Sequence, residues 1–222
     1  MPVITPASSP SSAPAPLRKQ VDAAHYRNGY DTPKRFVSYW HQIDLALRNG
    51  PRDALEIGPG SGFLSSYLRR AGLPLTTLDI DPELSPDVSA ALPDLPFPDA
   101  SFDLVIAYEV LEHIPFDRFE ACLREMGRVS RGHIALSLPD KERTFRLSSS
   151  FSKLWSFGWT IQVPRLFAPK HRFDGEHHWE IGKRGYRQRA ILEAIGRAGL
   201  EVRSHWRVPE HPSHHFFDLR KR

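Results

Sequence analysis

Strand-like and helix-like patterns alternate through the middle of the chain. Short runs rich in apolar and β-branched residues lie at 54–57, 75–80, 102–107 and 133–138, and glycine, proline or an acidic residue follows each within two positions. Amphipathic patterns with apolar residues three or four positions apart cover 63–72, 116–129 and 186–198. This order predicts an α/β fold with a parallel sheet, because a helix between two strands returns the chain to run in the same direction. A closing hairpin is predicted from two last strand-like runs, 200–208 and 214–219.

Three segments lie outside this alternation. Residues 1–20 form a predicted disordered tail, since Pro, Ser and Ala dominate positions 1–16 and offer too little apolar surface for a core. Residues 21–222 form the predicted domain, which opens with a helical cap at 21–50 that ends near Pro51. Residues 141–184 mix Trp and Phe with Lys, Arg and His, and long segments of this kind are usually functional. We interpret 141–184 as a substrate-binding insertion or lid.

Composition narrows the possible classes of function. The 222 residues suit one domain, and the net charge of +4 is too small to favour a nucleic-acid partner. Cys122 is the single cysteine and lies in a helical pattern, so we expect a small core residue in a reducing compartment. No apolar run approaches the roughly 20 residues that cross a bilayer. These features predict a cytoplasmic protein without a membrane span.

A glycine turn follows the first strand-like run. Glu56 precedes the turn, and Gly58, Gly60 and Gly62 occupy every second position before a helix begins at Phe63. Glycine is needed where the backbone approaches a ligand, and the first turn of a helix offers unpaired N–H groups. The stretch therefore predicts a site for a nucleotide-like ligand. The dinucleotide fingerprint G-x-G-x-x-G does not fit, because Phe63 stands where its third glycine belongs.

The run Glu56-Ile57-Gly58-Pro59-Gly60-Ser61-Gly62 resembles motif I of class I S-adenosylmethionine-dependent methyltransferases, in the methyltransferase type 11-like group. The resemblance extends over roughly residues 21–222 and includes an L-P-F...F-D pattern at 95–103. It implies a Rossmann-like three-layer α/β/α sandwich with a seven-stranded, mostly parallel sheet, whose antiparallel last strand inserts beside the fifth. It also implies S-adenosyl-L-methionine as cofactor, with Glu56 near its ammonium and its methionine part against Gly58, Pro59, Gly60 and Gly62.

An acid that binds the cofactor's ribose is expected at the end of the second strand. Asp79 lies 21 positions after Gly58, close to the interval of roughly 20 residues at which an acid reaches a ribose hydroxyl pair. Asp81 is the other candidate, but it precedes Pro82, so we expect it to form a turn.

The resemblance also implies contacts with the rest of the cofactor. Many members place an acid for the adenine amino group where this chain has Ala91, so Asp94 or main-chain groups near Leu92 are the expected adenine contacts. A segment before the first strand often covers the cofactor in this class. Tyr26 and Tyr30 are therefore candidates to cover the site, with core packing as the alternative.

Acidic and histidine residues follow the third strand-like run. Glu109, Glu112 and His113 would share one face if a helical turn begins there, and such ligands suit Mg or Mn. The E-x-x-E-H run resembles metal-dependent methyltransferases of the small-RNA 2′-O-methyl type and O-methyltransferases of ubiquinone synthesis, in which an H-x-W/F segment adds another histidine. His177 takes that position here, which makes Glu109, Glu112, His113 and His177 a candidate metal site for a divalent cation. Without a metal, Glu112 and His113 would line the pocket, and Glu109, His113 and His177 would be catalytic as bases or polar lining.

The leading functional hypothesis is methyl transfer to an oxygen or nitrogen of a small-molecule or lipid-intermediate acceptor. The alternatives are metal-dependent RNA 2′-O-methylation and a cofactor-binding regulator without catalysis. Neither a Ser-His-Asp pattern nor a P-loop suggests another chemistry. The acceptor and the oligomeric state stay open at this stage.

Overall fold

The computed structural model describes residues 19–26, 29–151, 155–162 and 168–222. The predicted tail therefore lies outside the described residues except for Lys19 and Gln20. In chain order the elements are η1 (Ala23–Tyr26), α1 (Pro33–Leu47), β1 (Ala54–Ile57), α2 (Phe63–Arg70), β2 (Leu75–Asp79), η2 (Pro82–Leu84), β3 (Val88–Ser89), β4 (Phe102–Tyr108), η3 (Leu111–His113), α3 (Phe116–Val129), β5 (Ser130–Pro139), β6 (Thr144–Phe151), β7 (Trp155–Gln162), α4 (Gln188–Arg197), β8 (Leu200–Arg207) and β9 (His214–Lys221).

Seven strands form one sheet in the order β3-β2-β1-β4-β5-β9-β8. The first five run parallel to one another, whereas β9 pairs antiparallel with both β5 and β8. The last strand thus lies beside β5, and the predicted closing hairpin is β8–β9. The predicted fold class, a Rossmann-like α/β sandwich with a mostly parallel seven-stranded sheet, is confirmed.

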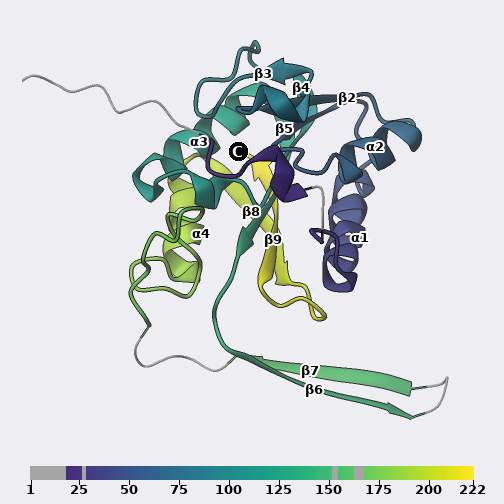
Figure 1. Ribbon diagram of the computed structural model, residues 1–222, viewed down its shortest axis with the longest axis vertical. Helices are drawn as coiled ribbons and strands as arrows, with labels where there is room; N and C mark the ends of the chain where they lie inside the picture. The colour runs from purple at the N-terminus through teal and green to yellow at the C-terminus, as the bar shows by residue number, and fades with distance from the viewer. Residues whose placement is uncertain (1–18, 27–28, 152–154, 163–167) are drawn as a thin grey trace, which may run out of the picture.

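Helices cover both faces of this sheet, with α1 and α2 on one side and α3 and α4 on the other (Figure 1). Successive residues of β4 alternate between two buried clusters. Leu104 and Ile106 belong to the cluster on the α1–α2 side, whereas Val105 and Ala107 belong to the cluster that contains Phe119 of α3. A strand buried on both faces has no polar alternation, which explains the continuous apolar runs in the sequence.

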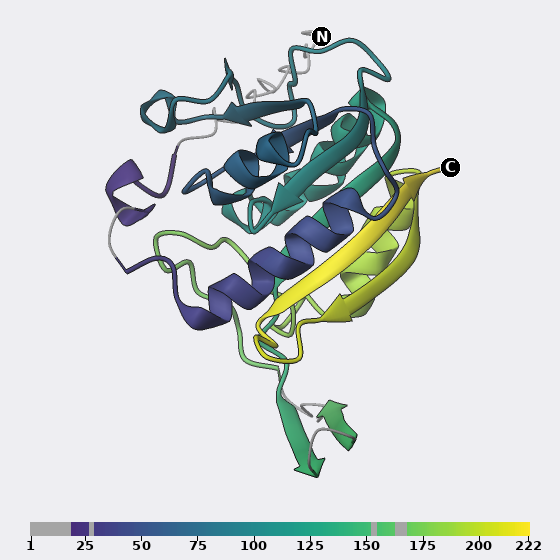
Figure 2. The same cartoon turned by 90° about the vertical axis from the view of Figure 1, so that its right-hand side faces the viewer.

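Residues 141–184, which were predicted as an insertion or lid without assigned strands, contain β6 and β7. β6 and β7 pair antiparallel as a separate two-stranded sheet. Figures 1 and 2 show this ribbon projecting away from the seven-stranded sheet. The part of the insertion from 168 onward returns to the body, where Lys141 N–H donates to the Ile181 carbonyl. No helix among the described residues is long and apolar enough to span a membrane.

Candidate active site

A cleft lies at the carboxyl ends of the parallel strands β1, β2 and β4, where open α/β sheets bind ligands. Its empty volume, open solvent included, is about 790 Å³. Four segments line it: the N-terminal stretch 19–26, the glycine turn after β1, the region from 78 to 92, and residues 109–114. The cleft therefore brings together segments that are far apart in sequence.

The glycine turn makes close contacts that leave no room for side chains. Gly58 has a φ of 70°, and a Cβ added there would lie 2.5 Å from Val110 Cγ2. Gly60 has a φ of 55°, and a Cβ there would lie 3.2 Å from Tyr26 Cε1. Tyr26 thus covers the turn from outside, in the place that the sequence suggested for it.

The remaining members of the turn lie around its outer side. Gly62 N–H donates to the Pro59 carbonyl at 2.9 Å, and Gly62 is the N-cap residue of α2. Gly58 lines the cleft, whereas Gly62 lines a neighbouring depression that also includes Tyr26. Tyr30 packs edge-on against Tyr26, with ring centroids 4.9 Å apart. Both predicted covering tyrosines therefore lie in one aromatic group beside the glycine turn.

Glu56 is a buried carboxyl just below the turn. It is 4% exposed, and Ser65 Oγ of α2 donates a hydrogen bond of 2.6 Å to it. Burial raises the pKa of Glu56 to about 7, although the Ser65 hydrogen bond acts in the opposite direction. No pattern in the sequence had pointed to Ser65 as its partner.

Asp79 and Asp81 take different positions at the end of β2. Both line the cleft, but the Asp81 carboxylate accepts from Glu83 N–H and caps η2, and it also pairs with Lys19 Nζ at 3.2 Å. Asp79 is half-buried, and its carboxylate accepts from Asp81 N–H at 2.8 Å. Burial raises the pKa of Asp79, and the backbone hydrogen bond from Asp81 lowers it. Lys19 lies within the stretch that the sequence assigned to the tail, and nothing in the sequence singled it out.

The expected adenine side of the cleft is lined by Ala90, Ala91 and Leu92. Leu92 is buried, whereas Asp94 is exposed and is not among the residues lining the cleft. The Asp94 N–H donates to the Ala91 carbonyl at 3.1 Å. Of the two expected adenine contacts, the structure brings only the Leu92 region into the cleft.

Glu109 leaves β4 in a conformation unusual for a residue with a Cβ, with a φ of 54°. Ser137 Oγ donates to its carboxylate at 2.8 Å, and His214 Nε2 lies 3.7 Å from it. Burial raises the pKa of Glu109, with the Ser137 hydrogen bond opposing the shift. The helical turn begins only at Leu111, so Glu109 does not share a helical face with Glu112 and His113.

Glu112, His113 and His177 converge at the wall of the cleft. One ligand atom from each lies within 4.8 Å of the other two. Glu112 is fully buried, and neither of its carboxylate oxygens has a hydrogen-bond partner among the described residues. Burial raises the pKa of Glu112 well above the usual carboxyl value. Burial lowers the pKa of His113, and the nearby His177 lowers it further, which favours a neutral imidazole.

Both histidines are held through one ring nitrogen. His113 Nδ1 lies 3.0 Å from the Glu176 carbonyl, and His177 Nδ1 lies 3.2 Å from Glu180 Oε1. Burial works to lower the pKa of His177, but Glu180 raises it above the usual value. A carbonyl or carboxylate on one ring nitrogen is the arrangement that orients histidine ligands at metal sites. The Nε2 atoms are then the ring positions available to a ligand.

Trp179 explains how the 177–180 segment reaches the cleft. Its side chain is fully buried, packs edge-on against Phe119 and donates from Nε1 to the Ile114 carbonyl at 2.9 Å. His178 N–H donates to the Glu112 carbonyl at 2.8 Å, which joins the segment to η3 directly. Gln20 Nε2 lies 2.8 Å from His178 Nε2, so the N-terminal stretch meets the same segment.

Comparisons with known proteins agree with this fold and cleft. The sheet order is that of the similar solved structures of methyltransferases reported below. Residues 55–136, which contain the turn, strands β2 and β4 and all of β1 except Ala54, match the family model described as a methyltransferase domain. This part of the chain is thus similar to a methyltransferase domain.

Relatives in sequence match part of the chain. A probable S-adenosylmethionine-dependent methyltransferase of Mycobacterium tuberculosis is 31% identical over 122 residues, which are 47% of this chain and 44% of the relative. A similarly named protein of Mycolicibacterium smegmatis is 32% identical over 93 residues, 35% of this chain and 36% of the relative. The chain thus matches less than half the length of these relatives.

Solved structures match nearly the whole chain in fold. The 1,6-didemethyltoxoflavin-N1-methyltransferase of Burkholderia thailandensis, with bound substrate and S-adenosylhomocysteine, has a TM-score of 0.60 at 15% identity and covers 89% of this chain and 84% of that one. Magnesium protoporphyrin IX methyltransferase of Synechocystis has a TM-score of 0.58 at 15% identity, with 90% and 91% covered. At these identities the likeness concerns the fold.

Proposed function

We propose that the protein transfers the methyl group of S-adenosylmethionine to an oxygen or nitrogen of a small-molecule or lipid-intermediate acceptor. One observation carries the proposal: Gly58 and Asp79, expected on the cofactor side, line the same cleft as Glu109 and His113, expected on the acceptor side. Methyl transfer from a sulfonium needs mainly the alignment of nucleophile, methyl carbon and sulfur. A cleft that holds both reactants provides this alignment. A cytoplasmic location remains part of the proposal.

The cofactor would lie across the glycine turn. In this proposal Glu56 binds the ammonium of the methionine part, the 58–62 turn contacts its backbone atoms, and Asp79 accepts from both ribose hydroxyls. The adenine contacts then come from the main chain near Leu92, since Asp94 lies outside the cleft. Residues 141–184 act as the lid, and the contact between Gln20 and His178 supports this for the part from 168 onward.

On the acceptor side, Glu112, His113 and His177 would hold a divalent cation such as Mg or Mn. The buried Glu112 oxygens without partners among the described residues support this, as do the two oriented imidazoles. Glu109 would complete the predicted set. The cation would supply Lewis acidity toward an acceptor hydroxyl. In a metal-free version, His113 accepts the acceptor's proton as a neutral base. An RNA 2′-hydroxyl is the second candidate acceptor, favoured by this group of residues alone.

The deciding experiment supplies purified protein and radiolabelled S-adenosylmethionine to a lysate of the host, followed by fractionation of the label. Label in an organic-solvent or small-molecule fraction supports the leading proposal, and label in RNA supports the second candidate. Calorimetry with S-adenosylhomocysteine and with NAD accompanies it. Binding of S-adenosylhomocysteine without transfer to any fraction would instead support a regulator without catalysis.

A further inference from the structure

A groove between α1 and α2 exposes aromatic side chains that the cleft does not use, and we call it the α1–α2 groove. Three of the five large hydrophobic side chains exposed among the described residues lie in it: Phe36 is 52% exposed, Trp40 61% and Tyr67 45%. Tyr39 and Phe63 also line the groove and stack on each other, with ring centroids 4.3 Å apart. Neighbouring exposed apolar side chains of this kind mark a binding surface.

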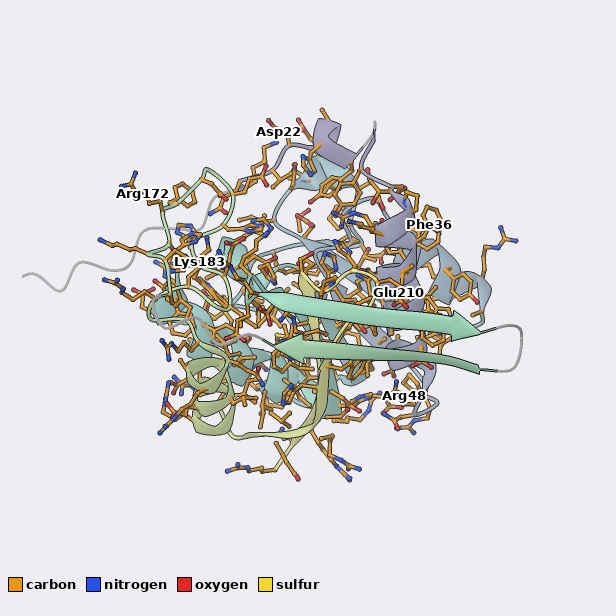
Figure 3. The ribbon with its side chains drawn as sticks, turned by 90° about the horizontal axis from the view of Figure 1, so that it is seen from below. Asp22, Phe36, Arg48, Arg172, Lys183 and Glu210 are labelled. Carbon is orange, nitrogen blue, oxygen red and sulfur yellow. The ribbon has the colours of Figure 1, made fainter. Side chains whose placement is uncertain are left out.

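The residues that line the groove carry no net charge. Asp44 and Arg48 are the charged residues among them, and they pair with each other one helical turn apart. Arg48 also lies over the Trp206 ring, 5.3 Å from its centroid. Figure 3 labels Phe36 and Arg48 toward opposite ends of α1, on one side of the body. A neutral aromatic groove suits an uncharged partner with apolar groups, because a charged partner would gain no ion pair there.

A second depression connects the groove with the cofactor cleft. Phe63 and Tyr67 line both the groove and this depression, and Tyr26 lines both the depression and the cleft. Lys19, the first described residue, lines the cleft as well. A chain segment that leads away from Lys19 can therefore follow a continuous series of depressions to the groove.

Residues 1–17, which lie outside the described residues, have a composition that matches the groove. They contain no charged side chain, and five of the seventeen residues are proline. Val3, Ile4 and Leu17 add aliphatic side chains. Proline-rich segments bind in aromatic-lined grooves because their extended conformation is preset and costs little entropy on binding. The segment thus has the chemistry of a ligand for this groove.

The segment is also long enough to reach the groove. Seventeen residues in a polyproline II conformation span roughly 50 Å at about 3.1 Å per residue. A domain of this size has a diameter of roughly 40 Å. Attachment to the same chain gives the segment an effective concentration on the order of millimolar, so even a weak contact with the groove is populated.

Other occupants fit the groove less well. Single-stranded nucleic acid and anionic lipid both require basic residues beside the aromatic rings, and the basic residue that lines this groove, Arg48, is paired with Asp44. A second copy of the chain would bury the exposed rings but would give the uncharged residues 1–17 no partner.

We propose that residues 1–17 bind in the α1–α2 groove of the same chain, with proline and aliphatic side chains against the three exposed aromatic rings. The bound segment helps to hold the stretch 19–26, which follows it, over the cleft. This interaction is additional to methyl transfer and does not depend on the identity of the cofactor or the acceptor.

The test is fluorine NMR of the full chain with 5-fluorotryptophan in place of its five tryptophans. The signal of Trp40 is identified by its loss in a Trp40→Phe variant. A nitroxide spin label is attached to a Ser9→Cys variant, and Cys122 does not take up the label because it is fully buried. We expect the nitroxide to broaden the Trp40 signal until it is lost, and reduction of the nitroxide with ascorbate to restore it. The signal of the buried Trp179 should stay unchanged.

Two further variants carry the same label. The groove variant combines Phe36→Gln and Tyr67→Gln, since glutamine is a good helix former. The matched control, Phe173→Gln, removes a ring that is 55% exposed outside the groove. We expect the groove variant to keep its Trp40 signal and the control to lose it. An unchanged Trp179 signal in both shows that the body is intact.

A Trp40 signal that the nitroxide does not broaden overturns the proposal, and so does equal broadening in the groove variant. Labelled chain without fluorine is also mixed with fluorinated chain without label. Loss of the Trp40 signal in this mixture to the same extent as within one chain shows that the groove binds the segment of another copy, and overturns binding within the chain. A dimer in light scattering that the groove variant dissociates, without broadening by the nitroxide, assigns the groove to a second copy instead.

Discussion

Replacing Glu56 by glutamine removes a buried charge while keeping the side chain's size and an oxygen that can accept from Ser65. In the protein without cofactor, burial raises the pKa of Glu56 to about 7, so about half of the carboxyls are protonated at pH 7. The proposed ammonium contact requires the ionised form. Binding of S-adenosylhomocysteine should therefore release a proton from Glu56 at and below neutral pH.

The size of the effect follows from that pKa. Each pH unit below about 7 lowers the ionised fraction about tenfold, which corresponds to about 1.4 kcal/mol of cofactor affinity. Above about pH 8 the carboxylate is fully ionised and the wild-type affinity should level off. There the Glu56→Gln variant should bind about ten- to hundredfold more weakly, because it lacks a charge-assisted contact of roughly 1.5–3 kcal/mol.

The assay is titration calorimetry of S-adenosylhomocysteine in buffers of different ionisation enthalpy, which gives the number of protons released. Ser65→Ala provides a control, since loss of the hydrogen bond that favours the carboxylate should move the pH midpoint upward. The Glu56→Gln variant should lose the proton release. Wild-type binding without proton release, together with a glutamine variant of equal affinity at high pH, would refute the reasoning.

Four further outcomes are expected. The raised pKa of Glu56 means that the folded cofactor-free protein loses stability as pH rises from about 4.5 through 7, by up to about 3 kcal/mol; melting curves of wild type against Glu56→Gln should diverge in that window and coincide below it. Asp79→Ala should weaken cofactor binding at least about tenfold in calorimetry, and Asp81→Ala should weaken it less. The opposite order would assign ribose binding to Asp81 instead of Asp79. His113→Ala and His177→Ala should retain cofactor binding but slow methyl transfer. Normal rates in both variants would exclude both the cation site and the metal-free base. Exhaustive EDTA treatment should abolish transfer until Mg or Mn is added, and full activity without either ion leaves the metal-free version.

The sheet was predictable because its signals are local. A strand covered on both faces must be apolar throughout, as in β4, and α3 begins and ends at the residues that its helical pattern indicated, Phe116 and Val129. The glycine turn was predictable for a similar reason, because the close approach of Val110 to Gly58 excludes any Cβ. The polar partners Ser65 and Glu180 left no local signal, since either residue type is ordinary on a surface.

The ribbon shows where periodicity was present but overlooked. Apolar and polar residues alternate along β7 from Trp155 to Gln162, which is the period of a strand, yet the whole of 141–184 was interpreted only as a substrate-binding insertion or lid. Backbone pairing decides the question, because residues 144–151 pair antiparallel with residues 155–162. A single strand's pattern cannot supply that information.

Glu112 links the fold to the chemistry proposed for it. A buried carboxyl without hydrogen-bond partners costs about 1–3 kcal/mol, and an apolar residue of similar size would avoid that cost. The imidazoles of His113 and His177, which lie within 4.8 Å, do not remove this cost, because neither forms a hydrogen bond with the carboxylate and their Nδ1 atoms already contact Glu176 and Glu180. His177, 64 positions after His113, is brought to Glu112 by Trp179 and by the backbone hydrogen bond from His178. The unpaired Glu112 carboxyl lowers the stability of the folded protein without ligand. A ligand bound at this point would give the carboxyl oxygens the partners that they lack.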